Sequence, residues 1–171
     1  TWGIEQLNVL EKIEARNNVI GNIQHLKSLN KLKHLELSNN KIVDISSLKN
    51  LNKLETLRLA NNEISDLLPL QALTSLKELR LDANKIEDLS PLKKLQNLKV
   101  LDLGDNQIQD LRPLSGLYKL EVLRLSQNKV HDIEPIFELP NLLVLEIWGN
   151  KLNKNSEKSV KKLNKRQIKV D

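Results

Sequence analysis

The stretch LKHLELSNNKIVDISSLKNLNK, residues 32–53, decides the fold. It carries leucine or isoleucine at positions 32, 35, 37, 42, 45, 48 and 51, and asparagine at position 40. The pattern returns every 22 residues, starting from Leu54, Leu76, Leu98 and Leu120, and in the other direction from Leu10. A fixed period of this length is typical of a repeat protein, in which each unit buries its apolar edge against its neighbours.

The composition bounds the class of protein. The chain has 171 residues, enough for one domain or one short solenoid. Aromatic residues make up only 2%, so leucine and isoleucine must form the core. The lack of cysteine excludes disulfides and thiolate metal sites. We find no apolar run long enough to cross a membrane, and no charged-then-apolar leader at the start of the sequence.

The net charge of +5 is unevenly distributed. From Lys151 onward the chain has eight basic and two acidic residues, a net charge of +6. The preceding 150 residues have 19 basic and 20 acidic residues, a net charge of −1. The repeats are therefore nearly neutral, and the tail is basic.

The period divides the chain into three parts. Residues 1–9 are predicted to be the second half of a truncated repeat. Either Trp2 and Ile4 form a minimal cap there, or a longer N-terminal cap has been removed, which is what we expect because a half repeat exposes apolar edges. Residues 10–152 hold six full repeats and a partial seventh, and residues 153–171 are predicted to form a C-terminal helix–strand cap.

Each repeat has a strand half and a helical half. An alternating run such as LETLRLA, residues 54–60, predicts a strand with one buried face, and the recurrence predicts seven parallel strands. The second half starts with aspartate, and proline follows in four repeats; this is helix-starting chemistry. The aspartates are Asp44, Asp66, Asp88, Asp110 and Asp132, and the prolines are Pro69, Pro91, Pro113 and Pro135. We expect short 3₁₀ or single-turn helices, and aspartates that cap them rather than bind a cation.

One asparagine follows the strand in every repeat: Asn18, Asn40, Asn62, Asn84, Asn106, Asn128 and Asn150. The backbone turns at this point, so its peptide groups lose their partners in the sheet. An amide side chain has two donors and an acceptor, and can bond to its own turn and to an adjacent one. We therefore interpret the seven asparagines as a structural ladder rather than as ligand contacts.

The period stops after Leu152. The segment 156–165 predicts a short helix with Ser156 as its N-cap and with Val160 and Leu163 turned inward. The alternation at residues 167–170 predicts a final edge strand.

The unit resembles the SDS22-like class of leucine-rich repeats, most clearly in NKIEDLSPLKKL (84–95) and NQIQDLRPLSGL (106–117). The resemblance implies an α/β fold, a right-handed solenoid with a curved parallel sheet on its concave side and short 3₁₀ or α segments on its convex side. The tail, residues 149–170, looks like the ending of bacterial internalin-like proteins. This likeness favours a secreted or cell-surface bacterial setting over a cytoplasmic one.

Function is expected on the concave face, where residues between the leucines are free to vary. Exposed apolar groups in contact usually mark an interaction surface, and tryptophan and arginine are enriched at binding hot spots. The residues predicted to contact a partner protein are Arg58, Arg80, Val100, Val122, Arg124, Val144 and Trp148, with Leu143 beside them. The alternative is that the C-terminal cap covers the valines, or that they are ordinary strand residues.

We expect no enzyme, cofactor or metal site. The three histidines His25, His34 and His131 are far apart in the repeat, and no catalytic or phosphate-binding motif is present. The basic tail lacks interleaved aromatic residues, which weighs against a nucleic-acid or membrane partner. We predict a monomeric, internalin-like protein-binding module. The alternatives are an SDS22-like phosphatase regulatory subunit, a structural spacer, or an electrostatic binder of nucleic acid through the basic cap.

Overall fold

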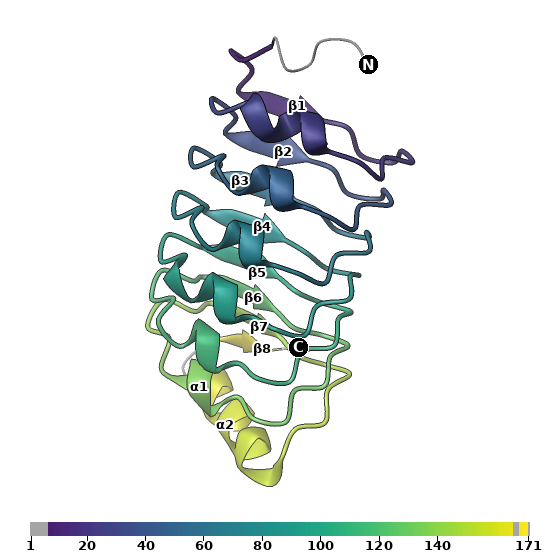
Figure 1. Ribbon diagram of the computed structural model, residues 1–171. Helices are drawn as coiled ribbons and strands as arrows, with labels where there is room; N and C mark the ends of the chain where they lie inside the picture. The colour runs from purple at the N-terminus through teal and green to yellow at the C-terminus, as the bar shows by residue number, and fades with distance from the viewer. Residues whose placement is uncertain (1–6, 166–167, 171) are drawn as a thin grey trace.

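The computed structural model describes residues 7–165 and 168–170, and in these residues it shows one parallel sheet. Its eight strands lie in chain order, β1 to β8, along one side of the molecule (Figure 1). The strands are β1 (Lys12–Glu14), β2 (His34–Glu36), β3 (Thr56–Arg58), β4 (Glu78–Arg80), β5 (Val100–Asp102), β6 (Val122–Arg124), β7 (Val144–Glu146) and β8 (Lys169–Val170). The predicted solenoid is confirmed. Trp2 and Ile4 lie outside the described residues.

The register of the sheet stacks equivalent residues of successive repeats. Leu57 in β3 pairs with Leu35 in β2 and with Leu79 in β4. Leucines and isoleucines of all repeats thereby form one continuous core, and most of them are fully buried. This arrangement explains how a chain with so few aromatic residues can fold: each repeat covers the apolar edge of the next.

Short helical segments lie opposite the sheet (Figure 1). They are the 3₁₀ helices η2 (Gln24–Ser28), η3 (Ser46–Leu48), η4 (Leu68–Leu70), η5 (Ser90–Lys94) and η6 (Arg112–Leu114), and the single-turn helix α1 (Glu134–Phe137). The Asp44 carboxylate accepts a hydrogen bond of 2.7 Å from the N–H of Ser46, the first residue of η3. Asp66, Asp88, Asp110 and Asp132 accept the equivalent bond. Each of these carboxylates therefore serves its own helix start.

The asparagine side chains connect neighbouring turns. Asn40 donates to the carbonyl of Leu37 in its own turn (2.9 Å) and to that of Ala15 in the preceding one (3.0 Å). Its Oδ1 atom accepts the N–H of Ile20, also in the preceding repeat (2.9 Å). Asn62, Asn84, Asn106, Asn128 and Asn150 repeat this arrangement. Asn18 differs: it is exposed, and its amide donates to the carbonyls of Ala15 and Arg16 in its own turn.

The C-terminal cap consists of α2 (Lys154–Lys165) and β8. The prediction of Ser156 as N-cap is wrong, because the helix starts two residues earlier and the Asn153 side chain accepts the N–H of Ser156 (2.8 Å). Ser156 is instead fully buried, and its hydroxyl accepts the N–H of Ile133 (3.0 Å) and lies 3.2 Å from Asp132 Oδ1. It therefore joins the cap to the last full repeat.

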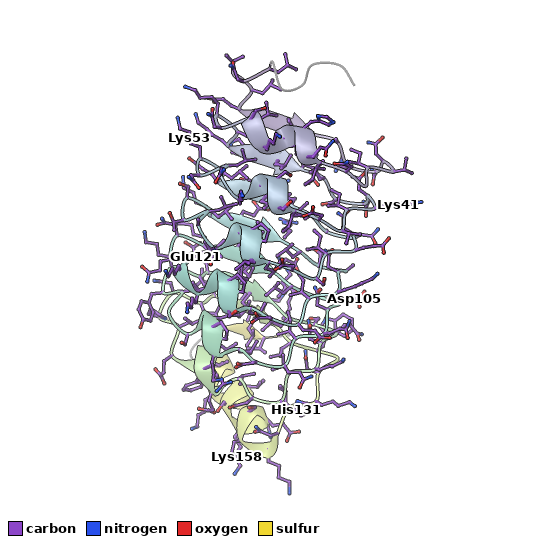
Figure 2. All side chains as sticks on the ribbon, in the orientation of Figure 1. Lys41, Lys53, Asp105, Glu121, His131 and Lys158 are labelled. Atoms are coloured by element: carbon purple, nitrogen blue, oxygen red, sulfur yellow. The ribbon has the colours of Figure 1, made fainter. Side chains whose placement is uncertain are left out.

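Charged side chains cover the outside of the solenoid, from Lys41 and Lys53 near its start to Lys158 on the cap (Figure 2). Within the described part of the chain, we find no helix that has both the length and the apolar character needed to cross a membrane.

Candidate protein-binding face

Three rows of side chains on the concave face carry the residues of interest. The row at the strand starts consists of Lys12, His34, Thr56, Glu78, Val100, Val122 and Val144, and two more rows follow it. The middle row consists of Glu14, Glu36, Arg58, Arg80, Asp102, Arg124 and Glu146, which pair across neighbouring strands. The end row lies two residues further along each repeat and consists of Arg16, Ser38, Ala60, Asp82, Gly104, Ser126 and Trp148. Because the leucines between them point into the core, these side chains are free to face outward.

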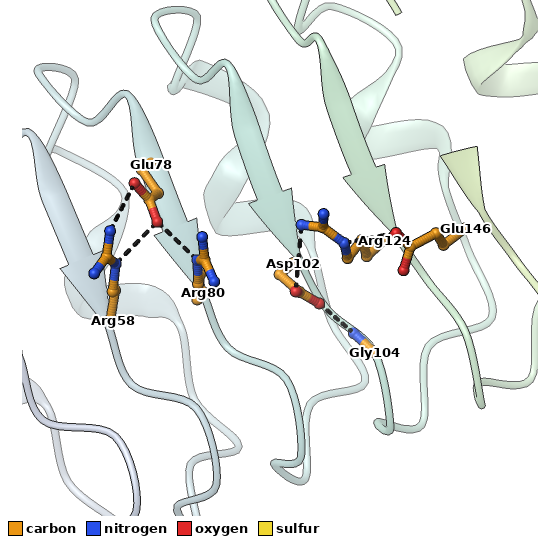
Figure 3. Close-up of polar contacts among 7 residues, drawn as sticks. All are labelled: Arg58, Glu78, Arg80, Asp102, Gly104, Arg124 and Glu146. Carbon is orange, nitrogen blue, oxygen red and sulfur yellow. Dashed lines mark hydrogen bonds and ion pairs between the residues drawn. The ribbon is translucent and has the colours of Figure 1, made fainter. Parts of the chain in front are cut away.

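The first two predicted arginines share one carboxylate (Figure 3). Arg58 forms a two-pronged contact with Glu78, with Nε 2.9 Å from Oε1 and Nη2 3.2 Å from Oε2. Arg80 Nε lies 2.7 Å from the same Oε1 atom. Glu36 approaches Arg58 from the other side at 3.8 Å. Both arginines are thus held in place by acidic side chains of the same face.

Burial alone would raise the pKa of Glu78, but the hydrogen bonds from Arg58 and Arg80, together with the positive charges of these two residues, outweigh it and lower that pKa. The hydrogen bond to Glu78 likewise raises the pKa of Arg58. Both shifts favour the charged forms of Glu78 and Arg58. Charge-assisted bonds of this two-pronged kind are among the stronger polar contacts in proteins.

Arg124, the third predicted arginine, is held further along the sheet. Its Nε atom lies 2.8 Å from Glu146 Oε1, and its Nη1 atom lies 3.7 Å from Asp102 Oδ2 (Figure 3). About a third of its side chain (31%) is exposed. The three arginines therefore belong to two separate ion-pair clusters, and a partner would meet them as fixed donors whose charges already have acidic partners.

The predicted apolar strip forms on the adjacent strands β5, β6 and β7. Val122 pairs with Val100 on one side and with Val144 on the other, and all three are partly exposed. These three residues are called the valine strip below. Leu143 and Trp148 are more exposed, at 59% and 56%. The cap helix α2 packs against α1 and β8, and β8 extends the sheet beside β7. The three valines, Leu143 and Trp148 together give the C-terminal half of the face its apolar character.

Two hollows lie on the concave face. The N-terminal hollow, of about 380 Å³, is lined by Lys12, Ile13, Glu14, His34, Leu35, Glu36, Thr56 and Arg58. The C-terminal hollow, of about 500 Å³, is lined by Asp82, Ala83, Gly104, Asp105, Ser126, Gln127 and Trp148. Both are shallow and open, so neither is the enclosed pocket that chemistry on a small substrate usually needs.

Two aspartates near the C-terminal hollow were missed by sequence reasoning. Burial raises the pKa of Asp82. Burial, and then the neighbouring charge of Asp82, also raises the pKa of Asp102. A signal was present in the sequence, because Gly104 stands in the end row directly between Asp82 and Ser126, and a missing side chain leaves a gap in a stacked row.

Within residues 7–165 and 168–170, no three His, Cys, Asp or Glu side chains come together as metal ligands would. His34 lies on β2 at the N-terminal hollow, whereas His25 lies on η2 on the opposite side of the solenoid. His131 lies in the turn before α1. The structure therefore brings none of the histidines into a shared site.

Comparison with known sequences identifies the repeat. Residues 52–94 and 96–137 each match the family model described as leucine-rich repeats in two copies, and residues 31–51 match the single leucine-rich repeat. No curated protein matches the chain significantly.

Solved structures of bacterial proteins share the fold. Internalin C2 of Listeria monocytogenes is 41% identical, with a TM-score of 0.85; the match covers 90% of this chain and 68% of that one. Internalin F of the same organism is 29% identical, with a TM-score of 0.74, and the match covers 97% and 55% of the two chains. A leucine-rich-repeat protein of Leptospira interrogans is 26% identical, with a TM-score of 0.82, and the match covers 98% and 50%. The chain is therefore a member of the leucine-rich-repeat family, of the internalin-like class.

Proposed function

We propose that this protein is a non-enzymatic recognition module that binds another protein through the C-terminal half of its concave face. Its similarity to internalins supports a role in protein interaction. The leading contacts are Val100, Val122, Val144 and Trp148, flanked by Arg124. Arg58 and Arg80 lie further toward the N-terminus and supply fixed donors at the edge of the contact.

The observation that carries the proposal is that Val100, Val122 and Val144 lie in one row across neighbouring strands, with an exposed Trp148 on the same face beyond the charged middle row. Exposed apolar groups in contact mark interaction surfaces, whereas isolated ones are common and carry no meaning. Tryptophan is also the side chain that most often dominates binding energy when a partner covers it. The rigid sheet fixes these groups before the partner arrives, which reduces the entropy lost on binding.

Two substitutions, Val122→Asp and Trp148→Glu, test the proposal. The immobilised chain is used to capture a partner from the surface proteins of candidate host cells, and the affinity of the purified partner is then measured by surface plasmon resonance. Val122→Asp places a charge in the middle of the valine strip, and Val43→Asp is the matched control, because Val43 is also exposed (58%) but lies just before the aspartate of its helical half.

We expect Val122→Asp and Trp148→Glu to abolish binding, while Val43→Asp leaves it unchanged. Thermal unfolding of all three variants should stay within a few degrees of the parent, which shows that the loss is local. Unchanged affinity in Val122→Asp and Trp148→Glu would refute the proposal and favour a structural spacer. Binding that all three variants keep at low salt and lose at moderate salt would instead indicate the electrostatic alternative through the basic cap.

A further inference from the structure

The C-terminal hollow exists because Gly104 has no side chain. A Cβ atom built on Gly104 would lie 3.6 Å from Asp102 Oδ1, 3.6 Å from the carbonyl oxygen of Ser126 and 4.0 Å from the Cβ atom of Asp82. These are ordinary contact distances, so alanine would fit and only a longer side chain would fill the space. A clash with a methyl group is therefore not the reason for glycine at position 104. Because Gly104 has no side chain, an open space remains between Asp82 and Trp148.

The acidic side of this hollow has positive charges nearby, Arg80 and Arg124, but neither forms an ion pair with Asp82. Among the described residues, Asp82 forms no ion pair and no side-chain hydrogen bond with another residue, although it is partly buried. The two nearest arginines are engaged elsewhere, since Arg80 binds Glu78 and Arg124 binds Glu146 and Asp102. Asp105 adds a second carboxylate at the rim. A carboxylate that is partly removed from water and left unpaired favours the arrival of a cation.

The floor of the hollow holds a second unsatisfied group. Ser126 is only 7% exposed, and its hydroxyl has no hydrogen-bond partner in the described structure. Buried polar side chains are usually paired. Ser28 and Ser47 also have buried hydroxyls without a partner among the described residues, and Ser126 differs from them in lining this hollow. Rotation about one bond turns the Ser126 hydroxyl, which can accept a hydrogen bond from an N–H group. Trp148 lines the same hollow, and an indole ring attracts cations through its face.

From these contacts we infer that the C-terminal hollow receives a basic side chain, arginine or lysine, of the partner protein. The inference rests on the proposed function and names the chemistry that the partner must bring. Asp82 supplies the counter-charge, Trp148 the cation-binding ring, Ser126 a hydrogen-bond acceptor and Gly104 the space. The nearby valine strip binds apolar groups of the same partner, so one end of the contact is apolar and the other is acidic.

The other hollow on the same face shows why the basic side chain belongs here. In the N-terminal hollow Glu14 lies 2.8 Å from Lys12, and Glu36 accepts the N–H of Ser38 and faces Arg58. Its carboxylates already have partners, and no glycine opens a gap in the rows that line it. A cation arriving there would have to displace an existing contact.

The test uses the full chain and three capped tripeptides, acetyl-Gly-X-Gly-amide, in which X is arginine, lysine or norleucine. Norleucine has the apolar stem without the charge. Each peptide is titrated into isotope-labelled protein and followed by amide NMR, with Trp148 fluorescence as a second readout. We expect saturable shifts at Gly104, Asp105 and Gln127 with at least one basic peptide, and affinity about tenfold lower or worse with norleucine, the size of effect expected for one charge-assisted contact.

Four variants locate the binding. Asp82→Asn should lower the affinity for the basic peptide by about tenfold. Glu63→Gln, which removes the same charge from the exposed ion pair with Lys85, should leave that affinity unchanged. Gly104→Leu should abolish binding by filling the hollow, whereas Gly104→Ala should keep most of it.

Equal binding of norleucine, unchanged affinity in Asp82→Asn and Gly104→Leu, or shifts centred on the N-terminal hollow would each overturn the inference. Those results would leave the proposed function standing, because partner capture by the valine strip is measured separately with Val122→Asp. Saturable binding of the basic peptides together with partner capture that ignores Val122→Asp would refute the proposed function alone.

Discussion

The two halves of the concave face are built on the same backbone but present different chemistry. From β1 to β4 the charged side chains bind one another, as in the cluster of Arg58, Glu78 and Arg80. From β5 to β7 Arg124 also pairs with Asp102 and Glu146, but the face there presents in addition valines, a glycine gap and an exposed Trp148, and Asp82 at its border with β4 forms no ion pair with any described residue. Because the repeats have the same register throughout, the difference lies entirely in the variable side chains. Both halves therefore pair their arginines within the face, but only the C-terminal half also leaves apolar groups and a carboxylate available to a partner.

The largest expected effect is a loss of partner affinity when the C-terminal half of the face is changed. Trp148→Ala should weaken partner binding by about 2 kcal/mol or more, roughly 30-fold, because it removes the most exposed aromatic group of the face. His34→Ala, on the strand face of the other half, should change affinity by less than about 0.5 kcal/mol, as most interface positions do. Surface plasmon resonance with the purified partner measures both. A larger loss for His34→Ala would place the contact on the N-terminal half.

The next effect breaks the N-terminal half. Glu78→Gln removes the carboxylate shared by Arg58 and Arg80 and leaves both arginines without it. We expect the free energy of unfolding at neutral pH to fall by about 1–2 kcal/mol, the cost of losing hydrogen bonds to charged groups. Urea unfolding followed by circular dichroism checks this. An unchanged midpoint would mean that the cluster organises the face without stabilising the fold.

The two halves should also respond to acid in opposite directions. The pKa of Glu78 is lowered in the folded state, so its stabilising contribution is present above the unfolded pKa and is lost as the pH falls through the folded value. The pKa values of Asp82 and Asp102 are raised, so their burial destabilises the fold at neutral pH, and protonation relieves this as the pH falls. Unfolding of the parent and of Glu78→Gln should therefore converge at low pH. A difference that persists in acid would contradict the assignment to Glu78.

The smallest effect sharpens the contrast. Asp82→Asn removes an unpaired, partly buried charge, so it should stabilise the isolated protein at neutral pH by a few tenths of a kcal/mol after solvent screening. The gain should vanish in acid, where Asp82 is protonated. Thermal unfolding at the two pH values measures it. Destabilisation at neutral pH would show that Asp82 already has a stabilising partner in the folded protein.

The repeat made the architecture predictable, and the variable positions limited the rest. Leucine spacing predicts the strands and the buried stack, because the same spacing can bury its apolar edge in only one way. Ser156 was misplaced because both Ser156 and Asn153 are good capping residues, and packing against Asp132 and Ile133 decided between them. Local preference alone cannot resolve such a choice.

The candidate residues could be placed on the concave face from the sequence, but their pairing could not. The rows of the concave face follow from the period, so Trp148 and the valines could be located from sequence. The binding of Arg58 and Arg80 to Glu78 depends on side-chain reach across strands, which the period does not specify. Asp82 and Asp102 were missed for a related reason, since their burial depends on what the neighbouring repeats place around them.

The asparagine bridges give the solenoid a direction of growth. From Asn40 onward each amide reaches back to the turn made earlier in the chain, as Asn40 does to Ala15 and Ile20, so every repeat is completed by its successor. During synthesis the newest repeat is always unfinished until the following one has emerged. At the last full repeat the Ser156 hydroxyl accepts the N–H of Ile133, so the cap closes the series. We therefore expect a ribosome-bound chain to resist proteolysis in steps of one repeat, each lagging one unit behind the exit tunnel.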